Sequence, residues 1–307
     1  GLISYICVVT AAAGEILLEP RFDSRTLLNQ IADKRPTILT AIPTMLTALL
    51  STPGVEDLNW EGIKHVISGG AAVPLELNRC FTELTGIVVQ QSYGMTKTSG
   101  TATCIPADGG PVESTTSGFA LPEVLVEIRS LSDPDTSLAQ GEIGEICIGG
   151  PNLMDGYWKI DNAQELYTSD GLFRSGDIGF IGTDGQLSVT DRVKDMVICS
   201  GYNVYPRVID EALVQHPAVY EAIAIGMPDT YRGETIVAVL ALRPGQSLSF
   251  SDLQTFLRDK LSPVEMPKHM VILGTIPKTE NGKLSRKLVR DLLLSTPEHI
   301  SSAPASR

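Results

Sequence analysis

Cysteine, histidine and basic residues are all scarce in this chain of 307 residues. The five cysteines are scattered without a Cys-x-x-Cys pair, and the four histidines have no metal-ligand spacing. The sequence therefore argues against a disulfide framework or a zinc site, and we expect reduced, buried thiols and no metal site. The 24 basic residues are outnumbered by 36 acidic ones, so the net charge of −12 argues against binding to nucleic acid or to an anionic membrane. A cytoplasmic protein is the simplest interpretation.

Long hydrophobic segments are also missing. Residues 2–14 are uncharged, and Ala11-Ala12-Ala13 resembles a signal-peptide cleavage site. The segment lacks a basic flank and is too short to span a bilayer. We interpret it as a core helix cut by the start of the chain, and we expect no membrane span.

Alternating apolar segments predict an α/β fold with a largely parallel sheet in residues 1–105. We expect strands at residues 37–42, 66–68 and 87–90, and helices at 43–50 and 75–84. Residues 106–191 begin with a Gly/Pro/Ser/Thr-rich connector, and the alternating segments 123–128 and 142–148 predict a β-rich subdomain with half-buried strands.

A compact α+β domain is predicted for residues 195–296. Its expected strands cover residues 196–199, 219–225, 235–242 and 270–272, and its expected helices cover 206–215, 251–261 and 284–294. The polar, Pro/Ser/Ala-rich residues 297–307 predict a flexible tail.

Lys283 ends the most informative polar segment, residues 277–283. Asn281-Gly282 is typical of a turn, so Lys283 is expected at the entrance of the helix that follows. A helix N-terminus and a cation together attract a carboxylate or a phosphate. The segment is not a Walker loop, because no glycine stands five residues before Gly282 and Leu284 replaces the required Ser or Thr. Taken alone, Lys283 is more simply read as an ordinary surface lysine.

Three further polar stretches precede it, at residues 68–74, at 91–97, and from 173–177 through 191–195 to 200–206. Two of them carry groups suited to a nucleotide base. Gly69 and Gly70 lack side chains and would let a flat ring approach the backbone, and Tyr93 offers an aromatic face for a purine. Ordinary tight turns and a half-buried core tyrosine are the plainer alternatives.

The second and third stretches carry groups suited to a phosphate and a ribose. Thr96 offers a hydroxyl and a backbone N–H to a phosphate, and Asp177 can accept two hydrogen bonds from a ribose diol. Arg192 presents a fixed fork of donors for ribose or phosphate oxygens.

These four motifs, in this order, resemble the adenylate-forming superfamily of acyl-CoA synthetases, peptide-synthetase adenylation domains and luciferases. The resemblance covers nearly the whole chain. It implies part of a large α/β domain with a β-subdomain, followed by a mobile α+β domain. It also implies an AMP site formed by Gly69, Gly70, Ala71, Tyr93, Gly94, Met95, Thr96, Asp177 and Arg192.

The resemblance also implies a two-step reaction on ATP, CoA and a small-molecule carboxylate. The carboxylate attacks the α-phosphate, and Lys283 and Thr96 are the implied catalytic residues. The C-terminal domain then rotates about a hinge at residues 192–194, with Lys194 as the pivot. After rotation, Gly201 and Tyr202 are implied to line the tunnel for the CoA arm.

Two features depart from the family pattern. Lys97 stands where the family usually has a glutamate that helps to hold Mg²⁺, and a cation cannot ligate Mg²⁺. Lys97 either contacts phosphate directly or marks impaired adenylation, and we favour impairment. The family's phosphate loop is also missing, so the chain resembles a C-terminal portion whose N-terminal part, or a second copy, would complete the site.

Acyl-CoA synthetase is the function that we predict, with a fatty acid or related carboxylate as substrate, because residues 153–158 resemble a stretch common in those ligases. A non-catalytic nucleotide-binding remnant and an adenylation domain that serves a carrier protein are the alternatives. Lys97 and the missing loop favour a remnant. The joint presence of the five charged or glycine positions opposes it, these being Asp177, Arg192, Lys194, Gly201 and Lys283.

Overall fold

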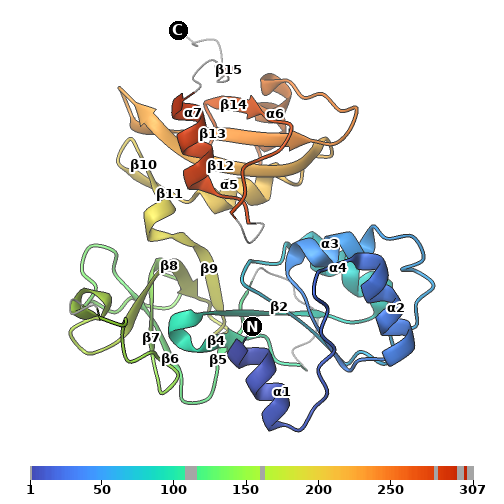
Figure 1. The fold of residues 1–307 in the computed structure, drawn as a ribbon. Helices are drawn as coiled ribbons and strands as arrows, with labels where there is room; N and C mark the ends of the chain where they lie inside the picture. The colour runs from blue at the N-terminus through green and yellow to red at the C-terminus, as the bar shows by residue number, and fades with distance from the viewer. Residues whose placement is uncertain (1, 108–115, 160–162, 280–282, 296–300, 303–307) are drawn as a thin grey trace. The chain divides into compact units, whose positions relative to one another are not determined.

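The computed structural model describes residues 2–107, 116–159, 163–279, 283–295 and 301–302. The chain forms two compact units (Figure 1). Unit 1 comprises Gly1–Ser175 and Gly179–Val189, and unit 2 comprises Gly176–Ile178 and Thr190–Arg307. Both units mix helices and strands, which confirms the predicted α/β class.

Unit 1 contains a five-stranded sheet in the order β1-β2-β3-β4-β5. Three parallel strands, β1 (Ile38–Thr40), β2 (His65–Gly69) and β3 (Val89–Met95), are followed by the antiparallel strands β4 (Gly100–Cys104) and β5 (Phe119–Ala120). Helices α2 (Ser24–Lys34), α3 (Pro43–Leu50) and α4 (Leu75–Thr85) accompany the parallel strands. Their apolar faces share one core with β1–β3, and Trp60 packs edge-on against Phe81 in that core.

Local signals explain where these helices begin and end. The α2 N-cap Asp23 accepts a hydrogen bond from the Thr26 N–H at 2.7 Å. Pro43 opens α3, where its missing N–H costs nothing. Gly86 ends α4 in the left-handed region at φ +74°. The helices predicted at 43–50 and 75–84 are therefore confirmed.

A second sheet has the order β6-β7-β8-β9. Its strands are β6 (Leu125–Arg129), β7 (Gly144–Gly149), β8 (Phe173–Ile181) and β9 (Leu187–Arg192). A strand is present as predicted in the segment 142–148, but the prediction that it is half-buried is wrong, because all six residues of β7 are buried. One of these buried residues is Glu145, and its carboxylate pairs with Arg174 at 2.8 Å. The alternating pattern predicted half-burial because it includes Glu145, but a charged residue can be buried in a strand when its charge is paired.

The first residues form a π-helix, η1 (Leu2–Cys7), and the short helix α1 (Val8–Ala11). A helix is present as predicted, but α1 has no buried residue, so the expectation of a core helix is wrong there. The expectation of buried thiols also holds only in part. All five cysteines are free, yet Cys7 and Cys80 are exposed whereas Cys147 and Cys199 are buried. Burial raises the pKa of the Cys147 thiol to about 12.

Unit 2 is built on a sheet in the order β11-β10-β13-β14-β15, with β12 paired to β13. Its strands are β10 (Val197–Cys199), β11 (Tyr202–Val204), β12 (Val219–Asp229), β13 (Gly233–Leu242), β14 (His269–Ile272) and β15 (Ser301–Ser302). Its helices are α5 (Pro206–Leu213), α6 (Phe250–Leu257) and α7 (Arg286–Ser295). Alternate residues of β12 and β13 enter two separate cores, one shared with α5 and α6 and the other with α7. The helices therefore cover both faces of this sheet.

Two boundaries in unit 2 differ from the predictions. Helix α7 begins at Arg286 and not at residue 284, because Leu284 forms an antiparallel bridge with Lys278. The predicted flexible tail, residues 297–307, contains β15, which pairs with β14. The other residues of the tail lie outside the described residues.

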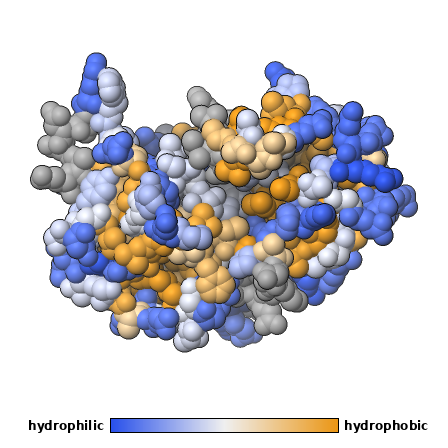
Figure 2. Space-filling view, turned by 90° about the horizontal axis from the view of Figure 1, so that it is seen from below, coloured by the Kyte–Doolittle hydropathy of each residue, from blue (hydrophilic) through white to orange (hydrophobic). Residues whose placement is uncertain are grey.

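Apolar surface is extensive on the face of the molecule in Figure 2. In unit 1, Leu18 and Trp158 are 75% and 88% exposed, and Phe22 and Ile38 are also exposed. Such surface favours association with another protein surface. None of the helices in the described ranges is long and apolar enough to cross a membrane.

A buried asparagine joins α4 to the strand that carries Tyr93, and its removal should destabilise unit 1. Asn78 donates to the Val89 carbonyl at 3.0 Å and accepts from the Val89 N–H at 3.1 Å. We expect Asn78→Leu to lower the free energy of unfolding by ~1–3 kcal/mol for each backbone group left unpaired. Denaturant unfolding measures this change. The control Arg79→Ala removes an exposed ion pair one residue away and should have little effect. Equal effects of the two changes would contradict the prediction.

Candidate functional site

The first two predicted stretches meet at one edge of the unit 1 sheet. Gly69, the last residue of β2, pairs with Ser92 in β3, so the segments Gly69-Gly70-Ala71 and Tyr93-Gly94-Met95 lie at neighbouring strand ends. The carboxyl ends of parallel strands are where open α/β sheets place their ligands. The prediction that the strand ends at residue 90 is wrong, because β3 continues to Met95.

A buried glutamine that the sequence reasoning missed holds these two segments together. The Gln91 side-chain oxygen accepts a hydrogen bond from the Val73 N–H at 2.6 Å. Its amide nitrogen donates to the Thr116 carbonyl and to the Ser117 hydroxyl, both at 3.0 Å. Gln91 thereby fixes the loop after β2 against β3 from inside the protein. A polar residue within a strand-like segment was the signal that could have identified it.

At two of the predicted glycines, Gly70 and Gly94, the backbone conformation or a close backbone contact disfavours any side chain. Gly70 has φ +79°, where other residues are strained. A Cβ at Gly94 would lie 1.8 Å from the Gly100 carbonyl oxygen, because β4 crosses closely at a register shift in the β3–β4 ladder. At Gly69 an added Cβ would lie 2.8 Å from the Ser92 hydroxyl.

Thr96 and Lys97 lie in a single 3₁₀ turn, Thr96–Thr98, directly after β3. Thr96 is exposed and Lys97 is half-buried. The Lys97 carbonyl accepts a hydrogen bond from the Met154 N–H at 2.8 Å, and the Thr98 carbonyl accepts one from Asn152 at 3.1 Å. The stretch 153–158 is therefore attached to the turn that carries Thr96.

Asp177 and Arg192 form an ion pair in unit 2, with Nε and Oδ1 3.1 Å apart. The Asp177 side chain is 10% exposed and that of Arg192 is 57% exposed. Two residues predicted for one nucleotide thus lie side by side. An arginine that approaches a carboxylate from the solvent side can exchange this contact for ligand oxygens.

Asp191, which the sequence reasoning did not single out, anchors the segment predicted as the hinge. Its buried carboxylate accepts the N–H groups of Arg192 and of Arg207, the second residue of α5, both at 2.8 Å. Burial raises the pKa of Asp191, and the hydrogen bond from the Arg207 backbone opposes the rise. Lys194 lies in the 3₁₀ turn Val193–Asp195 that follows.

Gly201 and Tyr202 belong to the tight hairpin between β10 and β11. Ser200 and Gly201 have φ +52° and +84°, as the two central residues of a type I′ turn do. Nothing lies within 4 Å of a Cβ added at Gly201, so the backbone conformation alone favours glycine there. Tyr202 is exposed.

Lys283 lies on one arm of a small loop before α7 and not at the helix entrance, which corrects the prediction. The Thr279 N–H donates to the Lys283 carbonyl at 2.8 Å, and the Lys283 N–H donates to the Thr279 hydroxyl at 3.3 Å. The side chain is exposed. The predicted turn Asn281-Gly282 lies outside the described residues.

The comparisons with known proteins match the chain in two segments. A family model described as AMP-binding enzyme matches residues 1–158, and one described as AMP-binding enzyme C-terminal domain matches residues 208–283. The chain belongs to the AMP-binding enzyme family. The resemblance to the adenylate-forming superfamily is thereby confirmed.

Its relatives include acyl-CoA ligases. The chain is 34% identical over 273 residues to a long-chain-fatty-acid–CoA ligase of Bacillus subtilis, covering 89% of this chain and 48% of the relative. It is 30% identical to a feruloyl-CoA synthase of an Amycolatopsis species, covering 93% and 58%. The chain thus spans about half the length of the curated relatives that it matches.

Solved structures give the same result. ATP-bound MatB from Rhodopseudomonas palustris matches with a TM-score of 0.87 and 31% identity, over 94% of this chain and 56% of that one. The Bacillus subtilis o-succinylbenzoate CoA synthetase in complex with its acyl-adenylate intermediate matches with a TM-score of 0.84 and 29% identity, over 94% and 58%.

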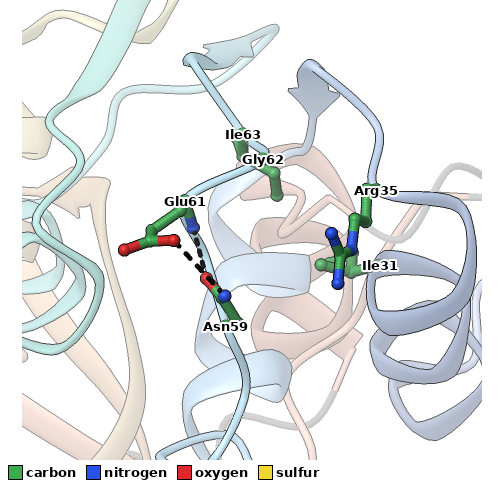
Figure 3. Close-up of a pocket in the computed structure, with 6 residues that line it drawn as sticks. All are labelled: Ile31, Arg35, Asn59, Glu61, Gly62 and Ile63. Carbon is green, nitrogen blue, oxygen red and sulfur yellow. Dashed lines mark hydrogen bonds between the residues drawn. The ribbon is translucent and has the colours of Figure 1, made fainter.

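The residues of this AMP-binding enzyme do not fit the Mg²⁺ site that the family implies. Mg²⁺ is bound by oxygen ligands, and the Lys97 side chain has no oxygen atom. Within the described parts of the chain, no three His, Cys, Asp or Glu side chains lie together as a metal site. Two cavities of about 230 and 310 Å³ lie beside α2, and neither is lined by a predicted site residue. The smaller one is shown in Figure 3, where Glu61 and Asn59 are hydrogen-bonded to each other on one wall.

Gly94→Ala should disrupt the strand end that carries Tyr93. The added methyl group overlaps the Gly100 carbonyl, which belongs to rigid backbone, so we expect a loss of ~3 kcal/mol in the free energy of unfolding and weaker AMP binding. Thermal unfolding and AMP titration measure the two effects. Gly274→Ala is the matched control, because nothing lies within 4 Å of its added Cβ. A fully stable Gly94→Ala protein would refute the close approach of β4.

Proposed function

We propose that this protein is an AMP-forming acyl-CoA synthetase, with a small-molecule carboxylate, ATP and CoA as substrates. One observation carries the proposal. Matches to both AMP-binding enzyme segments occur in order along one chain, and the Asp177–Arg192 pair lies in sequence between them. Relatives named as CoA ligases support this reading.

Each unit carries some of the residues proposed for the nucleotide. In unit 1, Gly69-Gly70-Ala71 and Tyr93-Gly94-Met95 would receive the adenine, and Thr96 would contact phosphate. In unit 2, Asp177 would accept hydrogen bonds from the ribose hydroxyls, and Arg192 would turn its donors to ligand oxygens. The strand-end position of the first group and the 3.1 Å pair in the second support these roles.

The first chemical step joins two anions. A carboxylate oxygen attacks the α-phosphorus, the bond from that phosphorus to the bridging oxygen breaks, and pyrophosphate leaves. Lys283 would stabilise the charge shared between carboxylate and phosphate. Its exposed position on a loop supports a role in contacting a ligand.

The second step transfers the acyl group to CoA. The thiolate of CoA attacks the acyl carbonyl, and AMP leaves with the electron pair of the broken C–O bond. The β10–β11 hairpin, with Gly201 at φ +84° and the exposed Tyr202, would border the CoA arm. Lys194 would be the pivot between the two steps, since it follows Arg192 in a short turn next to the anchored Asp191.

Fatty acids are the substrate class that we propose, because the relatives include long-chain and medium/long-chain fatty-acid–CoA ligases. A different product is the second candidate. The amide bond synthetase McbA from Marinactinospora thermotolerans matches with a TM-score of 0.84 and 30% identity. To distinguish the two candidates, the purified protein is given CoA or an amine as acyl acceptor, and formation of the thioester and of the amide is compared.

Asp177→Ala should weaken AMP binding. A hydrogen bond to a charged group contributes about 1.5–3 kcal/mol, so the Kd should rise about 10- to 100-fold. Calorimetric titration of the 307-residue chain with AMP measures it. The control Asp184→Ala removes an exposed carboxylate in the β8–β9 turn and should leave the Kd unchanged. If the parent chain itself does not bind AMP, both the ligase and the remnant hypotheses fail.

Lys97→Glu should increase pyrophosphate release in the presence of Mg²⁺. The change replaces a cation with an oxygen ligand of the type that Mg²⁺ prefers, next to Thr96. Carboxylate-dependent release of pyrophosphate from ATP is measured on the parent and the variant at several Mg²⁺ concentrations. Lys64→Glu, which changes an exposed lysine in the same unit, controls for net charge. Equal rates in parent and variant would show that Lys97 does not impair adenylation.

A further inference from the structure

The loop that carries Lys283 is attached to one strand of unit 2 at both of its ends. Its arms are joined to each other by hydrogen bonds from the Ser285 N–H to the Pro277 carbonyl, at 3.1 Å, and from the Thr279 N–H to the Lys283 carbonyl, at 2.8 Å. Each arm then contacts β12 through a charged side chain. On the first arm, the Lys278 ammonium pairs with Glu221 of β12 at 2.6 Å.

The second attachment is a half-buried ion pair at the first residue of α7. Arg286 pairs with Asp210 of α5 at 2.8 Å, and the two side chains are 17% and 21% exposed. Figure 1 shows α5 and α7 near β12, and residues of both helices contact that strand. A single arginine therefore joins α5, β12 and the start of α7.

The same pair completes the hydrogen bonding of the strand. Within the described residues, β12 pairs only with β13, which leaves the backbone groups on its other side without a ladder. Asp210 accepts the Ala224 N–H at 2.5 Å, and Arg286 donates to the Ala224 carbonyl at 2.7 Å. The aspartate and the arginine thus take the place of a neighbouring strand beside a fully buried residue. A pair with this geometry is costly to break, because it leaves a charge and two backbone groups unpaired.

We propose that Asp210 and Arg286, together with Glu221 and Lys278, are positioning residues that hold Lys283 for the adenylation step. The inference rests on the proposed function. Lys283 lies five residues after Lys278 and three before Arg286, so both attachments act within one short loop. A misplacement of about 1 Å at a charged catalytic group can cost about 100-fold in rate. Burial raises the pKa of Asp210 to about 6, and the charge of Arg286 opposes the rise.

The test compares Asp210→Asn with Glu211→Gln. The first change keeps the size of the side chain and an acceptor for Ala224 but removes the charge that pairs with Arg286. The second removes one negative charge from the next residue of α5, where Glu211 pairs with Arg207 at 3.3 Å. Hydrogen exchange at the Thr279 and Ser285 amides, followed by NMR in the 307-residue chain, should become about tenfold faster in Asp210→Asn and remain unchanged in Glu211→Gln.

Kinetics separate positioning from general destabilisation. In the protein expressed at its native length, Asp210→Asn should lower kcat for carboxylate-dependent pyrophosphate release about 10- to 100-fold, with little change in KM for ATP. In a Lys283→Ala background the same change should have no further effect, because the lysine that it positions is gone. Additive losses in the double variant, or unchanged amide exchange, would overturn the proposal.

A second variant covers the case in which Asp210→Asn does not fold. Glu221→Gln removes only the partner of Lys278 on the first arm and should give the same pattern at smaller amplitude. If Lys283→Ala releases pyrophosphate as fast as the parent, the proposed function fails. The amide exchange still decides, in that case, whether the two ion pairs hold the loop.

Discussion

Buried backbone groups that lie outside regular ladders need hydrogen-bond partners, and this constraint shapes the functional segments of the chain. Five polar side chains provide such partners in or near the functional segments. They are Asn78 on Val89, Gln91 on Val73, Asp191 on Arg192 and Arg207, and Asp210 with Arg286 on Ala224. The side chains proposed to position the candidate site therefore also complete backbone hydrogen bonding. Loss of such a partner costs more than loss of a surface charge, since a buried polar group is left without water.

The predicted site residues of the two units differ in their chemistry. Unit 1 has a strand edge with small residues and an aromatic ring, which suits a flat base. Unit 2 has the Asp177–Arg192 pair, the β10–β11 hairpin and the loop of Lys283, which suit charged and polar parts of the substrates. The two family models match separate segments, residues 1–158 and 208–283.

Much of the fold could be predicted from local signals. The helix at 43–50 was predicted with its observed bounds, because Pro43 marks its first turn. The extension of β3 from Gln90 to Met95 was missed, since Gln91 looks like a loop residue until its buried partners, Thr116 and Ser117, are known. The start of α7 was misplaced for the same reason, because the Lys278–Leu284 bridge occupies residues whose spacing alone is helical. Partners distant in the sequence overrode local preference in both cases.

The sequence by itself determined the class of fold, the order of the motifs and the identity of the charged residues, because these depend on side-chain chemistry and on spacing along the chain. The prediction that Lys97 replaces a Mg²⁺ ligand also came from the sequence alone. Only the tertiary structure decided that Asp177 lies 3.1 Å from Arg192. It also decided that Arg286 contacts both Asp210 and the side of β12 that has no neighbouring strand among the described residues. The close approach of the Gly100 carbonyl in β4, which requires glycine at position 94, is likewise visible only in the tertiary structure. These facts join residues that lie 6 to 76 positions apart, and only packing brings such residues into contact.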